Sequence, residues 1–117
     1  MRKVIVYGIP NCDTIKKTLN WLRKNKIAFE FHDYKKSGIS KEKLVIWCKR
    51  AGWEVILNKK SSTWRVLDTA VKDKIINQAA AVKLMSENTS IIKRPVTESA
   101  NNFLIGFNEI EYQRAFK

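Results

Sequence analysis

The feature that most constrains the fold is one cysteine, Cys12, placed where an apolar run gives way to an amphipathic one. Residues 4–7 are apolar and rich in β-branching, as in a buried strand. Apolar residues then recur at helical spacing, at Ile15, Leu19 and Leu22. Gly8 and Pro10 mark the turn between the two runs. The sequence therefore predicts a strand, a tight turn that carries Cys12, and a helix.

A cysteine at the start of a helix faces free backbone N–H groups and the positive end of the helix dipole. Both lower the pKa of a thiol, and the thiolate is the reactive form. Lys16 and Lys17 add positive potential in the next turn. Position alone leaves two interpretations open, a reactive thiol that attracts anions and a small hydrophobic residue buried in a loop.

The spacing after Cys12 limits its redox chemistry. The motif is Cys12-x-x-Ile15, so a second cysteine is missing from the usual C-x-x-C position. If Cys12 is catalytic, its resolving thiol comes from elsewhere. Cys48 and an external thiol such as glutathione are the two candidates.

The 117 residues have the size of a single domain, residues 1–117. No apolar stretch approaches the about 18 residues of a membrane span, and the N-terminal residues do not resemble a signal peptide. Two cysteines without an export signal indicate free thiols in a reducing cytoplasm. We expect a cytoplasmic protein that does not enter the membrane.

The formal net charge of +12 favours anionic partners, such as nucleic acid, an acidic protein surface or small anions including glutathione. The densest basic clusters are only pairs, at Lys35-Lys36, Lys59-Lys60 and Lys93-Arg94. The chain has no long basic tail and no recognisable zinc-finger or RNA-binding motif. We therefore favour a solvated basic surface over nucleic-acid binding.

The N-terminal third reads as a parallel βαβ unit. We expect a strand at about 3–7, a helix from Cys12 or Asp13 to Lys24, and a second strand over 28–33, where apolar and polar residues alternate. The only histidine, His32, falls on the polar side of that strand, so we expect it on the surface. No Cys or His lies at ligand spacing from it, which predicts no metal site.

The middle of the chain reads as helical. A loop over 34–39 leads to a helix over 41–51 with Ser40 as its cap, and Cys48 falls on the inward face of this helix. Short helices at 53–57 and from 63, and a helix-rich segment over 70–87, follow.

The C-terminal part reads as two strands and a helix. Pro95 marks the start of a strand, and residues 96–106 read as a hairpin with an Asn-rich turn. Asn108 caps a last helix over 109–115. The expected fold is α/β, with a thioredoxin-like core of a βαβ half and a ββα half (about 1–39 and 89–117) and an inserted helical subdomain (about 40–88).

In its motifs and its expected order of strands and helices, the chain resembles the YffB branch of the ArsC/Spx family over nearly its whole length. The resemblance is carried by the cysteine turn and by segments that share the family's motifs: residues 7–17, 31–36, Gly52-Trp53, Leu57-Asn58, 63–65, 92–96 and the Gly106-Phe107 ending. The combination is specific, although each motif alone is weak.

The resemblance implies a function and a site. Arsenate reductases of this family attack the oxyanion with the turn cysteine, and glutathione and glutaredoxin regenerate the thiol. By this resemblance, Cys12 would be the nucleophile and Arg94 would hold the oxyanion or glutathione near it. The resemblance also implies that the Arg94-Pro95 peptide bond is cis. The expected substrate- or glutathione-binding residues are Asn11, Asp13, Thr14, Asn58, Lys59, Arg94 and Pro95.

The chain departs from the arsenate reductases at two positions where they carry arginine. Asn58, next to Lys59 and Lys60, stands at one, and Gly106-Phe107 at the other. Lysine does not replace the fork of an arginine. These departures favour a glutathione-dependent thiol reductase over an arsenate reductase. The alternative is a regulator of the Spx kind, which binds RNA polymerase, although the Spx C-x-x-C switch is replaced by Cys12-x-x-Ile15.

Overall fold

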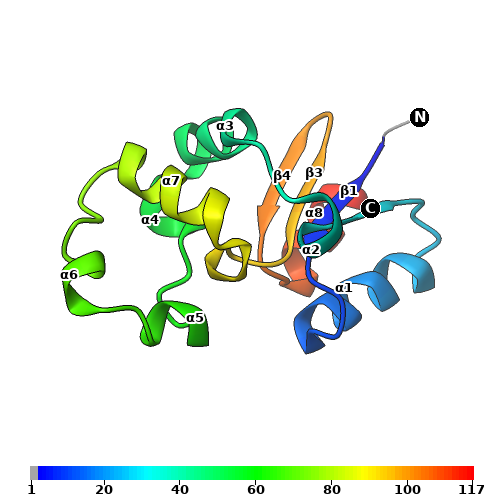
Figure 1. The fold of residues 1–117 in the computed structure, drawn as a ribbon. Coiled ribbons are helices and arrows are strands. Elements are labelled where there is room, and N and C mark those ends of the chain that lie inside the picture. The colour runs from blue at the N-terminus through cyan, green and yellow to red at the C-terminus, as the bar shows by residue number, and fades with distance from the viewer. Residues whose placement is uncertain (1–2) are drawn as a thin grey trace. The chain divides into compact units, whose positions relative to one another are not determined.

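The computed structural model describes residues 3–117. The chain divides into two compact units (Figure 1). One contains the residues up to Ser37 together with Arg94–Lys117, and the other is Gly38–Lys93. The first unit holds the strands, and the second holds most of the short helices.

The first unit is built on a four-stranded sheet in the order β2-β1-β3-β4. Its strands are β1 (Ile5–Gly8), β2 (Glu30–Asp33), β3 (Val96–Ser99) and β4 (Asn102–Ile105). β1 and β2 are parallel, whereas β3 runs antiparallel to both β1 and β4. This is the sheet of a thioredoxin-like α/β fold, as the sequence predicts. β2 begins two residues later than expected.

One face of the sheet forms the core of this unit with α1 (Asp13–Lys24) and α8 (Glu109–Phe116). Val6 from β1 packs with Trp21 and Leu22 of α1 and with Tyr112 of α8. The Tyr112 hydroxyl shares a hydrogen bond of 2.7 Å with the hydroxyl of Thr97 on β3. Burial of this face therefore fixes the helix that begins after Cys12 against the sheet.

The segment after β2 differs from the prediction. Residues expected to form a loop contain the short helix α2 (Tyr34–Ser37). The Asp33 side chain accepts a hydrogen bond of 2.8 Å from the Lys35 N–H, which ties down the start of this turn. The Tyr34 side chain is buried. His32 is also less exposed than expected, because its ring lies 4.8 Å from that of Tyr7 on the neighbouring strand.

The second unit is helical, as predicted for this part of the chain. It contains α3 (Lys41–Ala51), α4 (Trp53–Ile56), α5 (Ser62–Arg65), α6 (Thr69–Lys72), α7 (Gln78–Glu87) and the 3-10 turn η1 (Thr89–Ile91). Ser40 caps α3 by accepting a hydrogen bond from the Lys43 N–H, which confirms that prediction. α3 packs against α4 and α7, and Cys48 is buried on α3.

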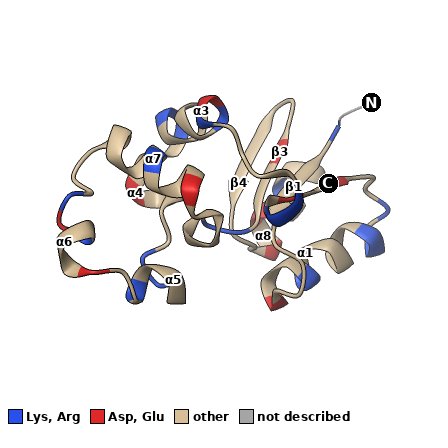
Figure 2. Ribbon diagram, in the orientation of Figure 1, with Lys and Arg blue, Asp and Glu red and all other residues tan. Residues whose placement is uncertain are grey.

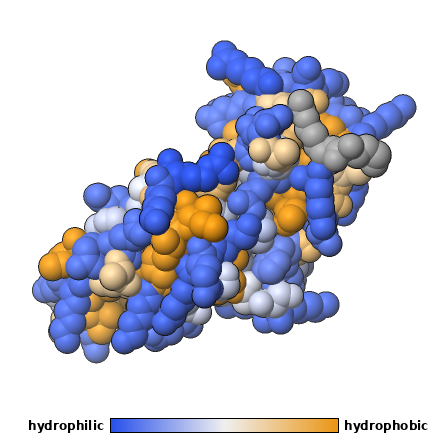
Figure 3. Space-filling view, turned by 90° about the horizontal axis from the view of Figure 1, so that it is seen from above, coloured by the Kyte–Doolittle hydropathy of each residue, from blue (hydrophilic) through white to orange (hydrophobic). Residues whose placement is uncertain are grey.

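Basic residues lie on the helices of both units and form no single dense block (Figure 2). Hydrophobic side chains appear between hydrophilic ones on the face seen in Figure 3. The most exposed large apolar side chains, Val66 and Ile76, belong to the helical unit. Over residues 3–117, every helix is too short or too polar to cross a membrane.

Candidate functional site

Cys12 lies at the junction that the sequence predicts, between β1 and α1. It is the N-cap residue of α1, in extended backbone conformation, and its side chain is half-buried. Asn11 precedes it with φ of +66°, a left-handed conformation that asparagine tolerates better than most residues. The turn therefore brings the Cys12 side chain to the open end of the helix, where backbone N–H groups lack helical partners.

The surroundings of Cys12 favour its thiolate. Burial raises the pKa of the thiol, but the backbone N–H of Ile15, the Arg94 side chain and the backbone N–H of Thr14 lower it more. The net pKa is below that of an ordinary cysteine. The Cys12 side chain accepts no capping hydrogen bond from the N–H groups of α1. These donors therefore act mainly by stabilising the thiolate. This is the electrostatic setting of a nucleophilic cysteine.

Arg94 reaches Cys12 because of the sheet topology. β3 runs antiparallel to β1, with Val96 opposite Tyr7, so the start of β3 lies beside the end of β1. Arg94 immediately precedes this start, and its side chain is near enough to the Cys12 thiol to lower the pKa of that thiol. The Arg94-Pro95 peptide bond is cis, as predicted. Residues more than 80 apart in sequence thus form one small site at the end of the sheet.

The three residues expected to bind substrate around Cys12 have different surroundings. Asn11 is exposed and forms the turn. Asp13 is the first residue of α1 and is exposed. Thr14 offers its N–H to Cys12, while its carbonyl accepts a hydrogen bond of 2.7 Å from the Thr18 hydroxyl. Among them, Thr14 has the most direct interaction with the sulfur.

Two other expected binding residues, Asn58 and Lys59, belong to the helical unit. The Asn58 N–H donates to the Ile91 carbonyl at 2.7 Å, and its side chain accepts from the Lys60 N–H at 3.1 Å. The Lys59 ammonium lies 5.7 Å from the centre of the Trp64 ring. Within their unit, both residues therefore have structural contacts, and their part in a site with Cys12 stays a prediction.

Two residues near Cys12 and Arg94, Ile15 and Tyr34, are not among the site residues that the sequence predicts. Ile15 acts through its backbone N–H, which the N-cap position of Cys12 could have indicated. The Tyr34 hydroxyl is buried without a hydrogen-bond partner within residues 3–117. Burial raises its pKa well above the ordinary value, against the opposing effect of Arg94. Tyr34 therefore keeps its proton near the Arg94 charge.

Within residues 3–117, no cluster of three or more His, Cys, Asp and Glu side chains could hold a metal ion. The site therefore consists of a thiol that favours its thiolate form, with an arginine side chain and two backbone N–H donors beside it. Such a set can attack a disulfide sulfur or an electrophilic oxyanion.

Comparisons with known proteins agree with this arrangement. The model of the ArsC family matches residues 7–115. A solved YffB protein (PA3664) is 43% identical over 97% of this chain and 99% of its own, with a TM-score of 0.93. An arsenate reductase (ArsC) related protein from Brucella melitensis is 40% identical, covers 98% and 95% of the two chains, and has a TM-score of 0.75.

A relative of a different kind is the global transcriptional regulator Spx of Streptococcus agalactiae. It is 33% identical to this chain over 115 residues, which are 97% of this chain and 82% of the relative. The fold, the cysteine turn and the family match lead to one conclusion: the chain belongs to the ArsC family.

Proposed function

We propose that this protein is a glutathione-dependent thiol reductase in which Cys12 is the nucleophile. The observation that carries the proposal is the lowered pKa of Cys12, produced by the Ile15 and Thr14 N–H groups and by Arg94. A thiolate is the form that attacks a disulfide sulfur, so a lower pKa increases the reactive fraction at neutral pH.

The proposed substrate is a mixed disulfide between glutathione and another thiol. The Cys12 thiolate attacks the glutathione sulfur, the S–S bond breaks, and the other thiol leaves as a thiolate that takes a proton from water. A second glutathione thiolate then attacks the glutathione sulfur now bound to Cys12. Oxidised glutathione leaves with both glutathione units, and the Cys12 thiolate is restored. Each step breaks one S–S bond and forms another, so the leaving thiol is reduced while one free glutathione is oxidised, and no other reductant is needed.

Thiol substrates fit this chain better than arsenate does. Arginine binds an oxyanion through two parallel hydrogen bonds, and Arg94 can supply one such fork. Asn58 stands where the arsenate reductases that this chain resembles carry another arginine. Their third arginine falls at Gly106-Phe107, where the Phe107 ring packs 4.9 Å from Tyr112.

The proposal also names partners and a compartment. Glutathione is the co-substrate, and a glutaredoxin could provide the second thiol in its place. Both act in a reducing compartment, so we propose that the protein works in the cytoplasm. No metal cofactor enters the proposed reaction.

The test measures alkylation of each cysteine against pH by mass spectrometry, with and without glutathione or arsenate. We expect Cys12 to react as a thiolate below the about 8.5 of a free cysteine, and glutathione to slow the reaction. Cys48 in the same sample is the internal control. The proposal is wrong if Cys12 titrates as an ordinary thiol and neither ligand protects it. Protection by arsenate alone would favour an oxyanion substrate.

A second candidate function is regulation by binding to RNA polymerase. The observation that favours it is the likeness to the regulator Spx over nearly the whole chain. Ile15 replaces the second cysteine of the switch, so this binding would be independent of a local disulfide. It predicts a stable complex with purified RNA polymerase that persists in the Cys12→Ser variant. The reductase proposal predicts no such complex.

A further inference from the structure

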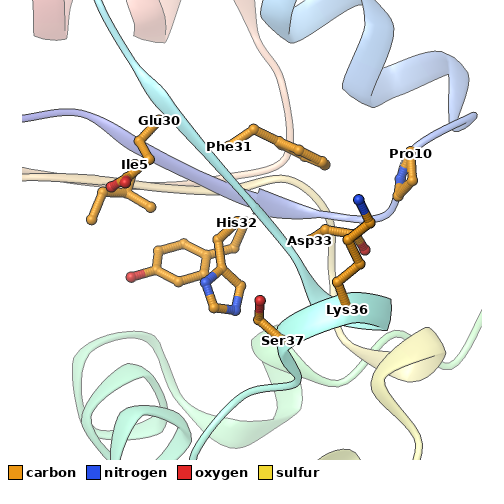
Figure 4. Close-up of a pocket in the computed structure, with 9 residues that line it drawn as sticks. Ile5, Pro10, Glu30, Phe31, His32, Asp33, Lys36 and Ser37 are labelled. Carbon is orange, nitrogen blue, oxygen red and sulfur yellow. The ribbon is translucent and has the colours of Figure 1, made fainter.

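A cavity of about 610 Å³ lies along β1 and β2 in the first unit, on the face of the sheet opposite the core (Figure 4). Its wall includes Ile5 and Tyr7 of β1, which pair with Glu30 and His32 of β2. Val6, between them, points into the core on the other face. β2 is an edge strand, so the cavity is a groove that follows the edge of the sheet.

The groove has opposite charges at its two ends. Glu30 lies at the start of β2, and Lys36 lies on α2 after the end of β2. The two are separated by about four strand residues, or roughly 13 Å. The rings of Tyr7 and His32 lie between them, packed 4.8 Å apart. Asp33 lines the groove at the Lys36 end, so a negative and a positive side chain lie together there (Figure 4).

The charge at the Lys36 end is available to a ligand. The Lys36 ammonium makes no hydrogen bond or ion pair within residues 3–117. One oxygen of the neighbouring Asp33 accepts the Lys35 N–H, which leaves the other oxygen uncommitted. At the far end, Glu30 pairs with Lys3 at 3.1 Å, in an exposed ion pair that solvent screens. A carboxylate can bind Lys36, and an ammonium beside it can bind Asp33.

The Lys36 end of the groove adjoins the cysteine turn. Pro10 lines the groove and lies two residues before Cys12, a separation that an extended chain spans in at most about 7 Å. An extended tripeptide reaches roughly 10 Å. A peptide thiol whose sulfur meets Cys12 can therefore extend past Pro10 into the groove.

We infer that this groove binds the zwitterionic arm of a small peptide thiol, with its carboxylate at Lys36 and its ammonium at Asp33. The inference rests on the proposed function for the position of the sulfur at Cys12. It adds a specificity site that is distinct from Arg94, because Lys36 selects among thiols while Arg94 acts on the sulfur of Cys12. The volume lies within the about 300–1,000 Å³ that is usual for small-molecule sites.

The experiment titrates S-methylglutathione, which cannot form a disulfide, into the full chain and follows amide chemical shifts by NMR. The Lys36→Ala and Lys36→Glu variants are compared with Lys35→Ala, which removes the same charge from the adjacent residue outside the groove. We expect Kd to rise about threefold for Lys36→Ala, roughly tenfold for Lys36→Glu, and little for Lys35→Ala. N-acetylated S-methylglutathione, which lacks the ammonium, should also bind more weakly to the wild type.

Formation of a mixed disulfide between Cys12 and oxidised glutathione, followed by mass spectrometry, separates this inference from the proposed function. If the wild type forms the mixed disulfide but Lys36→Glu binds S-methylglutathione as tightly as the wild type, the groove inference fails alone. If binding depends on Lys36 but no mixed disulfide forms, the proposed function fails and the groove stands. Shifts confined to residues outside the groove would also overturn the inference.

Discussion

The two cysteines of this chain have opposite surroundings. Cys12 is half-buried at the N-cap of α1, where two backbone N–H groups and Arg94 lower its pKa. Cys48 is 3% exposed in the second half of α3, and burial raises its pKa. The N–H groups inside a helix already bond to carbonyls, so they offer nothing to a thiolate there. Position along a helix therefore decides in which direction the pKa of each thiol is shifted.

This difference leads to separate roles. Cys12 has donors aimed at its charged form, which is what a nucleophile needs. Cys48 fills space among the apolar residues of the helical unit, as free cysteines often do. A resolving role for Cys48 stays a prediction, and it would require a thiol of raised pKa to become exposed and ionised. The proposed function instead uses external glutathione as the resolving thiol.

The largest expected effect is on the rate of mixed-disulfide reduction, when each cysteine is replaced by serine. Cys12→Ser should lower glutathione-dependent reduction of a mixed disulfide at least about 1000-fold, because a serine hydroxyl is not ionised at neutral pH. Cys48→Ser should keep most of the activity of the fraction that remains folded. Chromatographic measurement of substrate loss tests both. An equal loss in the two variants would show that Cys48 resolves Cys12.

A smaller effect is expected at Arg94. Arg94→Ala removes a charged hydrogen-bond donor from the thiolate, so the pKa of Cys12 should rise and its alkylation at neutral pH should slow roughly tenfold. Arg94→Lys keeps the charge but not the fork, and should lie between alanine and the wild type. Alkylation of Cys48, measured in the same samples, should stay unchanged. An unchanged rate at Cys12 would remove Arg94 from the activation of the thiol.

For stability, we expect the larger effect at Cys48 and the smaller one at Cys12. Cys48→Ser places a hydroxyl in a buried site and should lower the free energy of unfolding by about 1–3 kcal/mol. Cys48→Ala tests the loss of volume alone. Cys12→Ser should be close to neutral, because serine is a favoured N-cap residue. Urea denaturation of the three variants measures these differences, and a strongly destabilised Cys12→Ser variant would contradict the role of position 12 as a cap.

The smallest effect is the pH dependence of stability, which has opposite signs for the two thiols. The folded-state pKa of Cys12 is lowered, so its contribution is full above the unfolded value of about 8.5 and is lost as pH falls through the folded pKa. The folded-state pKa of Cys48 is raised, so its contribution is full below about 8.5 and is lost as pH rises towards the folded pKa.

Urea denaturation between neutral and alkaline pH checks these signs. The stability of the wild type relative to Cys12→Ser should increase with pH, and its stability relative to Cys48→Ala should decrease. Two slopes of the same sign would mean that the environments of the two thiols are not opposite.

Several features of the fold follow from short stretches of sequence. The apolar run before Cys12 and the helical spacing after it place the cysteine at the start of α1. The caps at Ser40 and Asn108 are formed as predicted, by hydrogen bonds from the N–H groups of Lys43 and Glu111. These features depend on neighbours within a few residues, which is why a single sequence reveals them.

Other features depend on strand pairing. The contact between His32 and Tyr7 exists because β1 and β2 pair in a register that places the two residues side by side. The α2 turn gains from the burial of Tyr34, which no local pattern announces. The groove that ends at Lys36 forms only when β2 lies at the edge of the sheet.

The sequence by itself determined the position of Cys12 between a strand and a helix, where a thiol meets the free N–H groups at the start of the helix. Its resemblance to the ArsC family also pointed to Arg94 and to the cis bond before Pro95. Only the tertiary structure decided that the Arg94 side chain reaches the Cys12 sulfur. The physical reason is that antiparallel pairing of β1 and β3 brings the end of one strand beside the start of the other, across a distance in sequence that local patterns cannot span.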